Sequence, residues 1–383
     1  MKRLYLPQEI IYGQDAVGSA CDSIAGYGNR YLIITDETML QLGLVNKLTQ
    51  TLEGEWTIFS GVTSEPTDEI VNQVLAILQA QEQPIEAIIA LGGGSCIDTA
   101  KAASVMYRNG YSTISALASA KEFAVSPLPV IAIPTTAGTG SEATDVTVIT
   151  DTQQQIKYMM KDKSFLPKVA IIDPLMTQSS PPSITAATGL DALCHAIESY
   201  ISRKAHTLTK ELSLSAVKAI MHHIVTAYQD GNHLVAREEM ALAALKAGIA
   251  FSNASVTLIH GMSRPIGALF HIPHGFSNAI LMHEVLDYSK PAIIKPLAEL
   301  TEYVYPEFSG TDEEKATYFL QQLEDICQTL SIRTYHDFGV NKEQFVASLD
   351  KMCDDAFASG SPDNNPVVPT KEEMKQIYLR SWK

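Results

Sequence analysis

The sequence predicts two domains: an α/β domain with a mostly parallel sheet in residues 1–183, and an all-helical domain in residues 184–383. Two patterns support this division. In the first half, short β-branched runs alternate with segments of helical periodicity, as strands and helices do in α/β folds. After Pro181 and Pro182, strand-like runs nearly vanish and long Ala- and Leu-rich segments with helical periodicity replace them. A chain of 383 residues is long enough for two or three domains.

Short apolar runs in the first half are typical of buried strands, at Tyr31–Thr35, Trp56–Ser60, Ala87–Leu91, Val130–Ile133 and Val169–Ile172. Two segments between them, Glu69–Gln79 and Ile97–Met106, have helical spacing, so we expect a parallel sheet covered on both faces. The second half predicts helices at Thr185–Ser202, Leu208–Gln229, Ala236–Asn253 and Glu313–Leu330. Thr370 and Glu373 form a capping-box pattern that opens a last helix.

Composition excludes several classes of protein. Acidic residues outnumber basic ones 43 to 28, and a net charge of -15 disfavours binding to the phosphates of a nucleic acid. No apolar run reaches the roughly 18 residues of a membrane span, and the first residues do not resemble a secretory signal. The five cysteines form no CxxC pair, which predicts reduced thiols and a cytoplasmic location.

A glycine turn follows the predicted strand Ala87–Leu91. Gly92, Gly93 and Gly94 let the backbone approach a ligand closely, and the helix that Ser95 opens offers its N-terminal amides to an anion. The turn is therefore a candidate phosphate site, although the GxGxxG pattern of the common Rossmann fold is absent. The alternative is a plain strand-to-helix turn.

A second loop, residues 133–144, also follows a predicted strand. Its hydroxyls are candidates to bind phosphate, ribose or nicotinamide, and they belong to Thr135, Thr136, Thr139 and Ser141.

Asp36 ends the strand Tyr31–Thr35. A carboxylate there accepts hydrogen bonds from ribose hydroxyls and repels a 2′-phosphate, which favours NAD over NADP. Asp36 precedes the glycine turn by 56 residues, whereas the acid of a usual Rossmann motif follows it by about 20. A dinucleotide that touches both requires a different sheet topology; the alternative for Asp36 is a solvated turn residue.

Candidate metal ligands belong to the second half, because all ten histidines lie at or after residue 195. Asp191 and His195 are four residues apart and share one face of a helix. His260, His271 and His274 follow within one later segment. One carboxylate with two or three imidazoles suits Fe(II) or Zn(II), whereas each histidine taken alone has the ordinary alternative of a core or surface residue.

Such a centre implies a reaction class. A divalent ion held by one carboxylate and neutral histidines lowers the pKa of an alcohol oxygen and polarises an aldehyde oxygen. A nicotinamide held by the first half can then exchange a hydride with the substrate carbon. The sequence therefore predicts a redox site built between the two halves.

Four motifs together resemble the iron-containing (group III) alcohol dehydrogenases: Gly92–Lys101, Pro134–Glu142, Asp191–Glu198 and His260–Gly275. The match runs nearly the whole chain, in order. The resemblance implies a dehydroquinate-synthase-like fold, a small alcohol or aldehyde substrate, NAD, and iron with zinc as the alternative metal. It also implies a homodimer or larger assembly, in which the segment Leu4–Ile11 pairs between subunits.

The resemblance also assigns roles to single residues. It implies that the metal ligands are Asp191, His195, His260 and His274, while His271 falls at a position that is not a ligand in the family. It implies pyrophosphate contacts for Gly93, Gly94, Ser95 and Asp98. In the family, the residues around nicotinamide and ribose lie at the positions of Thr135, Thr136, Thr139, Val148 and Lys157. Asp36 matches the position where members that use NAD carry an aspartate.

Arg264 departs from the family pattern, because many relatives carry a histidine there. A histidine near the metal relays protons near neutral pH, whereas a guanidinium stays protonated. Our hypothesis is that Arg264 lies close to the site and favours substrates with an anionic tail, such as a carboxylate or sulfonate; the alternative is a contact with a nearby acid or the cofactor. Phe251, Met262, Phe270 and Ser361–Pro369 are further candidates to shape the pocket.

Three other functions stay open. A zinc polyol dehydrogenase resembling glycerol dehydrogenase shares the fold and cofactor, but four candidate ligands favour the iron-type branch. A lyase resembling dehydroquinate synthase needs several basic residues around a sugar phosphate, and residues 184–290 are poor in clustered Lys and Arg. A non-catalytic metal- or nucleotide-binding protein is disfavoured because the motifs are intact except at Arg264.

Overall fold

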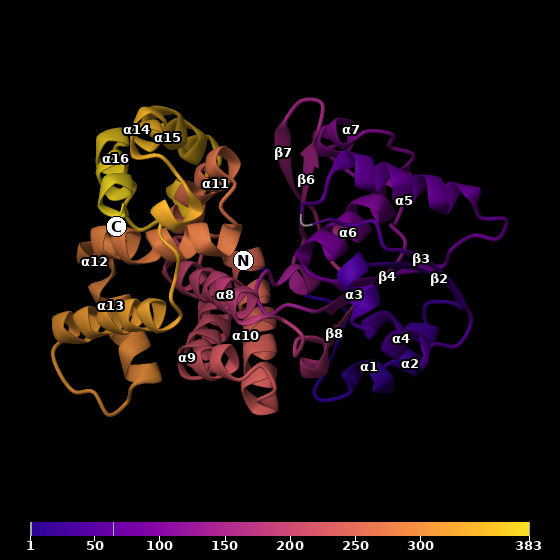
Figure 1. The fold of residues 1–383 in the computed structure, drawn as a ribbon, viewed down its shortest axis with the longest axis horizontal. Coiled ribbons are helices and arrows are strands. Elements are labelled where there is room, and N and C mark those ends of the chain that lie inside the picture. The colour runs from indigo at the N-terminus through magenta and orange to yellow at the C-terminus, as the bar shows by residue number, and fades with distance from the viewer. Residues whose placement is uncertain (1, 64, 383) are drawn as a thin grey trace. The chain divides into compact units, whose positions relative to one another are not determined.

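The computed structural model describes residues 2–63 and 65–382, which form two compact units (Figure 1). The first unit comprises residues 5–180, and the second comprises residues 181–382 together with residues 2–4. The first is an α/β unit and the second is helical, as the sequence predicts. All five cysteines are free thiols.

The α/β unit is built on a parallel sheet with the strand order β1-β8-β5-β4-β2-β3. The strands are β1 (Glu9–Tyr12), β2 (Arg30–Ile34), β3 (Glu55–Phe59), β4 (Ala87–Gly92), β5 (Val130–Pro134) and β8 (Val169–Ile172). The predicted strands agree with β2, β3, β4, β5 and β8 to within one residue at either end. β2, β4, β5 and β8 are buried on both faces, which is why their short apolar runs are recognisable without an alternating pattern. β3 lies at the edge of the sheet and is partly exposed.

Strand β1 was not predicted as part of this sheet. Its four residues are partly exposed and pair in parallel with β8 of the same chain, from Glu9 beside Val169 to Tyr12 beside Ile172. β1 is the outermost strand of the sheet, so β8 pairs with only one of its two edges. The expectation that the segment Leu4–Ile11 pairs between subunits therefore stays a prediction.

Helices cover both faces of the sheet. Leu32, Ile34 and Ile88 pack on the side of α5 (Asp68–Ala80), α6 (Gly94–Asn109) and α7 (Ile114–Ser119). Tyr31, Ile33 and Ile89 pack on the side of α1 (Ala16–Ser19), α2 (Cys21–Ala25) and α4 (Leu44–Thr49). The short helix α3 (Glu37–Gln41) follows β2, and β6 (Val146–Asp151) forms an antiparallel hairpin with β7 (Ile156–Lys161).

In the helical unit, α8 (Pro182–Ile201) is largely buried and packs against α9 (Thr207–Gln229), α10 (Leu234–Ala254) and α12 (His274–Val304). The remaining helices are α11 (Leu258–Phe270), α13 (Asp312–Thr329), α14 (Lys342–Ala347), α15 (Leu349–Ala358) and α16 (Lys371–Arg380). The predicted capping box at Thr370 and Glu373 is present at the start of α16. Short 3₁₀ turns are η1 (Ser141–Ala143), η2 (Lys163–Phe165), η3 (Pro174–Met176), η4 (His336–Phe338) and η5 (Pro362–Asn364).

Helices α11 and α12 were not predicted, because both contain proline. Pro265 lies within α11, and Pro291 and Pro296 lie within α12, where Ile293 leaves the helical conformation and kinks the helix. Within the described residues, no helix on its own combines the length and apolar character needed to cross a membrane; α10 and α11 meet those criteria only together, with a bend of 102° between them.

Candidate metal and nucleotide sites

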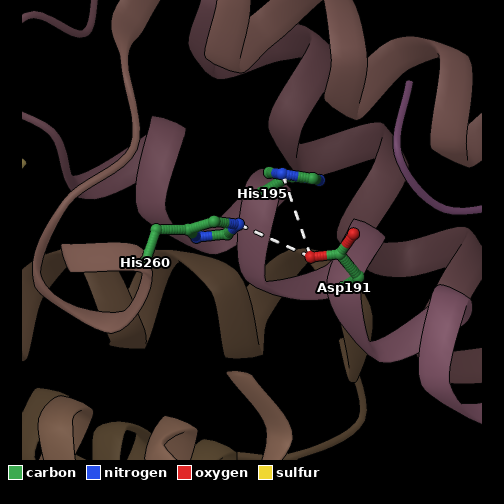
Figure 2. Close-up of side chains that lie close together, drawn as sticks. All are labelled: Asp191, His195 and His260. Atoms are coloured by element: carbon green, nitrogen blue, oxygen red, sulfur yellow. Dashed lines mark ion pairs between the residues drawn. The ribbon is translucent and has the colours of Figure 1, made fainter. Parts of the chain in front are cut away.

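Three predicted metal ligands come together inside the helical unit. Asp191 and His195 lie on α8 and His260 lies on α11, and their candidate ligand atoms are all within 4.8 Å of one another (Figure 2). Oδ1 of Asp191 is 3.9 Å from Nε2 of His195 and 3.5 Å from Nε2 of His260. All three residues are buried. The helical spacing of Asp191 and His195 places them on one face of α8, as the sequence predicts.

His274 lies beside this group, at the first position of α12. Its Nε2 is 3.7 Å from Oδ1 of Asp191, and its side chain is 46% exposed, so it is the most accessible of the four. His271 behaves differently: it caps the end of α11 in a left-handed conformation, with φ 55°, and is exposed. Of the four residues implied by the resemblance, the three histidines thus surround one carboxylate oxygen of the fourth, Asp191, and His271 is not among them.

The charges in this cluster support one another. Burial alone would raise the pKa of the Asp191 carboxyl, but the imidazoles of His195, His274 and His260 outweigh it and hold that pKa well below its usual range. Burial would lower the pKa of His260, but the Glu198 and Asp191 carboxylates raise it to about 9. The cluster is therefore anionic at Asp191 and attracts positive charge.

Glu198 was not assigned a role from the sequence, although it ends the motif Asp191–Glu198. Its side chain is fully buried and accepts hydrogen bonds from the Thr257 hydroxyl (2.8 Å), the Ile259 amide (2.7 Å) and Nδ1 of His260. The contact with an anionic carboxylate fixes the proton on Nδ1 and leaves Nε2 to face Asp191. Its position three residues after His195 on the same helix was the available signal.

Asn278 is a second residue that the sequence reasoning missed. It lies one turn after His274 on α12, and its Nδ2 is 2.7 Å from Oδ1 of Asp191, 3.1 Å from Nε2 of His260 and 3.3 Å from Nε2 of His274. These three acceptor atoms thus converge on one partly positive nitrogen. A carboxylate oxygen and imidazole nitrogens that converge in this way fit Fe(II) or Zn(II) by the chemistry of the donor set.

Of the predicted pocket residues, Phe251 adjoins the cluster, since its ring stacks on His195 with 4.1 Å between centroids. Met262 and Phe270 have other contacts. The carbonyl of Met262 accepts a hydrogen bond from the Tyr378 hydroxyl, and Phe270 packs against Phe345.

In the α/β unit, three predicted cofactor segments meet at the carboxyl ends of neighbouring strands. Asp36 follows β2, the glycine turn follows β4, and the loop from Thr135 follows β5, and these strands are adjacent in the sheet. Oδ2 of Asp36 lies 3.6 Å from the point that a Cβ at Gly92 would occupy. The sheet thus has the different topology that joint use of Asp36 and the glycine turn requires. Its order changes direction at β2 and β4, where open α/β sheets bind ligands.

The glycine turn and the threonine loop are in contact. Gly92 has φ 155°, and Gly93 is the N-cap of α6. A Cβ at Gly94 would lie 2.9 Å from Cγ2 of Thr139, so this close approach requires glycine. The first amides of α6, from Gly94 and Ser95 onward, form the kind of helix N-terminus that binds phosphate.

Asp98, on α6, connects the threonine loop to strand β6. One carboxylate oxygen accepts a hydrogen bond from the Ser141 hydroxyl (2.6 Å), and the other accepts one from the Val148 amide (2.9 Å). The buried Lys101 ammonium donates to Ser141 Oγ and to the carbonyls of Thr144 and Val146. Both side chains therefore anchor the threonine loop and the β6–β7 hairpin to α6.

The other predicted cofactor residues lie nearby in the fold. The buried Thr135 donates its amide hydrogen to the Gly92 carbonyl, which joins the two loops directly. Thr136 lies 3.8 Å from the point that a Cβ at Gly93 would occupy. Lys157, on β7, pairs with Glu65 at 2.8 Å, and both side chains are exposed.

Comparison with known proteins gives matches along both units. A family model described as iron-containing alcohol dehydrogenase matches residues 7–174, and one described as the C-terminal part of the Fe-containing alcohol dehydrogenase family matches residues 185–382. The chain belongs to the iron-containing alcohol dehydrogenase family.

Individual relatives of this dehydrogenase agree. It is 34% identical to the lactaldehyde reductase of Escherichia coli (strain K12), over 99% of either chain. Its fold matches a solved 1,3-propanediol oxidoreductase with a TM-score of 0.94 and 29% identity, over 100% of both chains. A sulfoacetaldehyde reductase from Bifidobacterium kashiwanohense, solved in complex with NAD+, matches with a TM-score of 0.89 and 26% identity, over 100% of this chain and 99% of that one.

The dehydrogenase is thus an NAD-linked, metal-dependent oxidoreductase of alcohols and aldehydes. The predicted enzyme class and fold are confirmed. None of the relatives described above is a lyase or a non-catalytic protein, so those two alternatives gain no support from them.

Proposed function

We propose that this chain transfers a hydride between NAD(H) and a small alcohol or aldehyde, at an iron centre held by Asp191, His195, His260 and His274. The observation that carries the proposal is the convergence of the three imidazoles on Oδ1 of Asp191, from the separate helices α8, α11 and α12. When bound, the metal supplies a Lewis acid for the substrate oxygen and the nicotinamide supplies or accepts the hydride.

The chain's own residues prepare this centre. Asp191 provides the negative charge, and Glu198 holds a proton of His260 on Nδ1, so that Nε2 is the ring nitrogen that a metal would bind. Asn278 donates to Asp191 and so fixes the direction of its carboxylate. Phe251 covers one face of His195 and excludes water from that side of the site.

For the cofactor, we propose that Asp36 binds the adenosine ribose, and that Gly93, Gly94 and Ser95 bind the pyrophosphate. Thr135, Thr136, Thr139, Val148 and Lys157 belong to the nicotinamide and ribose region. The contacts of Asp98 to Ser141 and Val148 favour a positioning role, in which its carboxylate shapes the loop beside the pyrophosphate. NAD is favoured over NADP because the Asp36 carboxylate lies beside the glycine turn.

Metal-reconstituted turnover tests the proposal. Chelated enzyme is loaded with Fe(II) or Zn(II) and assayed with NADH and NADPH against a panel of short aldehydes, and with NAD+ and glycerol. We expect the highest rates with Fe(II) and NADH, and little oxidation of glycerol. Undiminished turnover in the chelated enzyme contradicts the metal centre, whereas zinc-dependent glycerol oxidation favours the polyol alternative.

We also propose that the enzyme is a homodimer, as the family resemblance implies. Size-exclusion chromatography with light scattering gives its mass directly, and a mass near 41.7 kDa, that of one chain, contradicts the proposal.

A further inference from the structure

The Arg264 guanidinium lies next to the metal cluster. Arg264 follows His260 by one turn of α11, so the two residues share a face of the helix. Within the cluster, His274 has the largest exposed fraction, so the cluster is accessible on the side of His274.

This cation has no carboxylate partner within 4.0 Å among residues 2–63 and 65–382. Its hydrogen bond within the described part of the chain runs from Nη1 to the Ser361 hydroxyl, at 3.0 Å. Glu198 contributes a more distant attraction, but its oxygens already accept hydrogen bonds from His260, Ile259 and Thr257. The alternative that Arg264 exists to pair with a nearby acid is therefore unsupported, and most of its five N–H donors remain for another acceptor.

Ser361 is held firmly enough to orient the guanidinium. The following turn η5 is anchored by Asn364, whose Nδ2 donates to Ser255 Oγ and to the Val256 carbonyl, both at 3.1 Å. Pro362 packs on Gly261, where a Cβ would lie 2.9 Å from the proline ring. The turn thus rests on α11 one residue beyond His260, and it fixes the position of the Arg264 partner.

We propose that Arg264, oriented by Ser361, forms an anion-binding subsite beside the metal centre. The enzyme would then select short aldehydes that carry a carboxylate or a sulfonate at the end opposite the aldehyde group. This inference rests on the proposed function and names its substrate class. A guanidinium offers two parallel N–H donors to such a group, and a half-buried position strengthens that interaction over one in water.

The main test is a comparison of kcat/KM for length-matched aldehydes with wild-type enzyme and R264Q, both loaded with metal. Sulfoacetaldehyde and succinate semialdehyde serve as anionic substrates, and propanal and pentanal as neutral ones. We expect the anionic-to-neutral ratio to be high in the wild type and to fall about 10- to 100-fold in R264Q, the usual effect of losing a hydrogen bond to a charged group. R264K, which keeps the charge but not the planar fork, should give an intermediate ratio.

The ratio is measured on one preparation, so partial unfolding of a variant cancels. R380Q is the matched control: Arg380 is a cation of the same unit, on α16, that pairs with Glu284, and its loss should leave the ratio unchanged. Equal ratios in the wild type and R264Q overturn the subsite while leaving the proposed oxidoreductase intact.

Binding of ethanesulfonate, measured by isothermal titration calorimetry, tests the subsite without turnover. We expect its dissociation constant to rise about 10- to 100-fold in R264Q. If R264Q binds ethanesulfonate as tightly as the wild type does, the subsite is contradicted, whether or not any aldehyde is reduced. If no aldehyde in the panel is reduced but binding is weakened in R264Q, only the proposed function is contradicted.

Discussion

Nδ1 of His260 donates a hydrogen bond to the Glu198 carboxylate, and this contact joins α11 to α8. Helix α8 therefore supplies Asp191 and His195 and also orients the histidine that α11 supplies. The same carboxylate accepts the Ile259 amide at the start of α11, where the helix dipole favours a negative charge. The geometry of the candidate metal centre thus depends on a residue that does not face the metal.

Substitution of Glu198 by glutamine should weaken metal binding. The amide oxygen still accepts from Nδ1, but the loss of charge makes Nε2 a poorer ligand, so we expect the Fe(II) dissociation constant to rise about 10- to 100-fold. Competition with a chelator measures it. Glu299→Gln is the control, because Glu299 also contacts α8, through Tyr200, away from the cluster. An equal effect of both substitutions would assign Glu198 a general structural role.

Substitution of Asp191 by asparagine should abolish metal retention, because Asp191 is the acceptor around which the imidazoles gather. We expect affinity to fall by more than about 100-fold, beyond the effect of a supporting residue. Metal content after dialysis, measured by mass spectrometry, gives the result. His271→Asn is the matched control, since asparagine tolerates its left-handed conformation. Full metal retention by the Asp191 variant would rule out the assigned ligand set.

Substitution of Asp36 by asparagine should relax the preference for NADH. Asparagine preserves the N-cap that Asp36 provides to the Met39 amide, but it removes the charge that repels a 2′-phosphate. We expect the NADH-to-NADPH ratio of kcat/KM to fall about tenfold, roughly 1.4 kcal/mol. Glu37→Gln, at the adjacent position, should leave the ratio near the wild-type value. No change in the Asp36 variant would remove this residue from the cofactor site.

Glu142 makes stability depend on pH. Burial raises the pKa of its carboxyl to about 7 in the folded protein, from 4.5. Between these pH values the folded state binds more protons than the unfolded state, so the free energy of unfolding falls as pH rises. Glu142→Gln should therefore be more stable than the wild type above pH 7, by about 3 kcal/mol, with little difference below pH 4.5.

Urea unfolding of both proteins between pH 4 and pH 8 measures the difference for Glu142. The exposed Glu122→Gln serves as the reference for loss of one negative charge. A difference that is constant across this pH range would show that Glu142 has the same protonation in the folded and unfolded states.

The features that could be predicted from the sequence alone are those that depend on residues close together in the chain. The strands β2, β4, β5 and β8 follow from short apolar runs, and the start of α16 follows from the capping box at Thr370. The pairing of Asp191 with His195 follows from helical spacing. In each case the information lies within a few residues of chain, so backbone geometry suffices to predict the result.

Only the tertiary structure decided the contacts between distant segments. The proline-containing helices α11 and α12 form because packing offsets the missing hydrogen bonds. Asp36 reaches the glycine turn because β2 lies next to β4, and Arg264 meets Ser361 across 97 residues. Strand order and the packing of helices minimise the free energy of the whole chain, which no local spacing encodes.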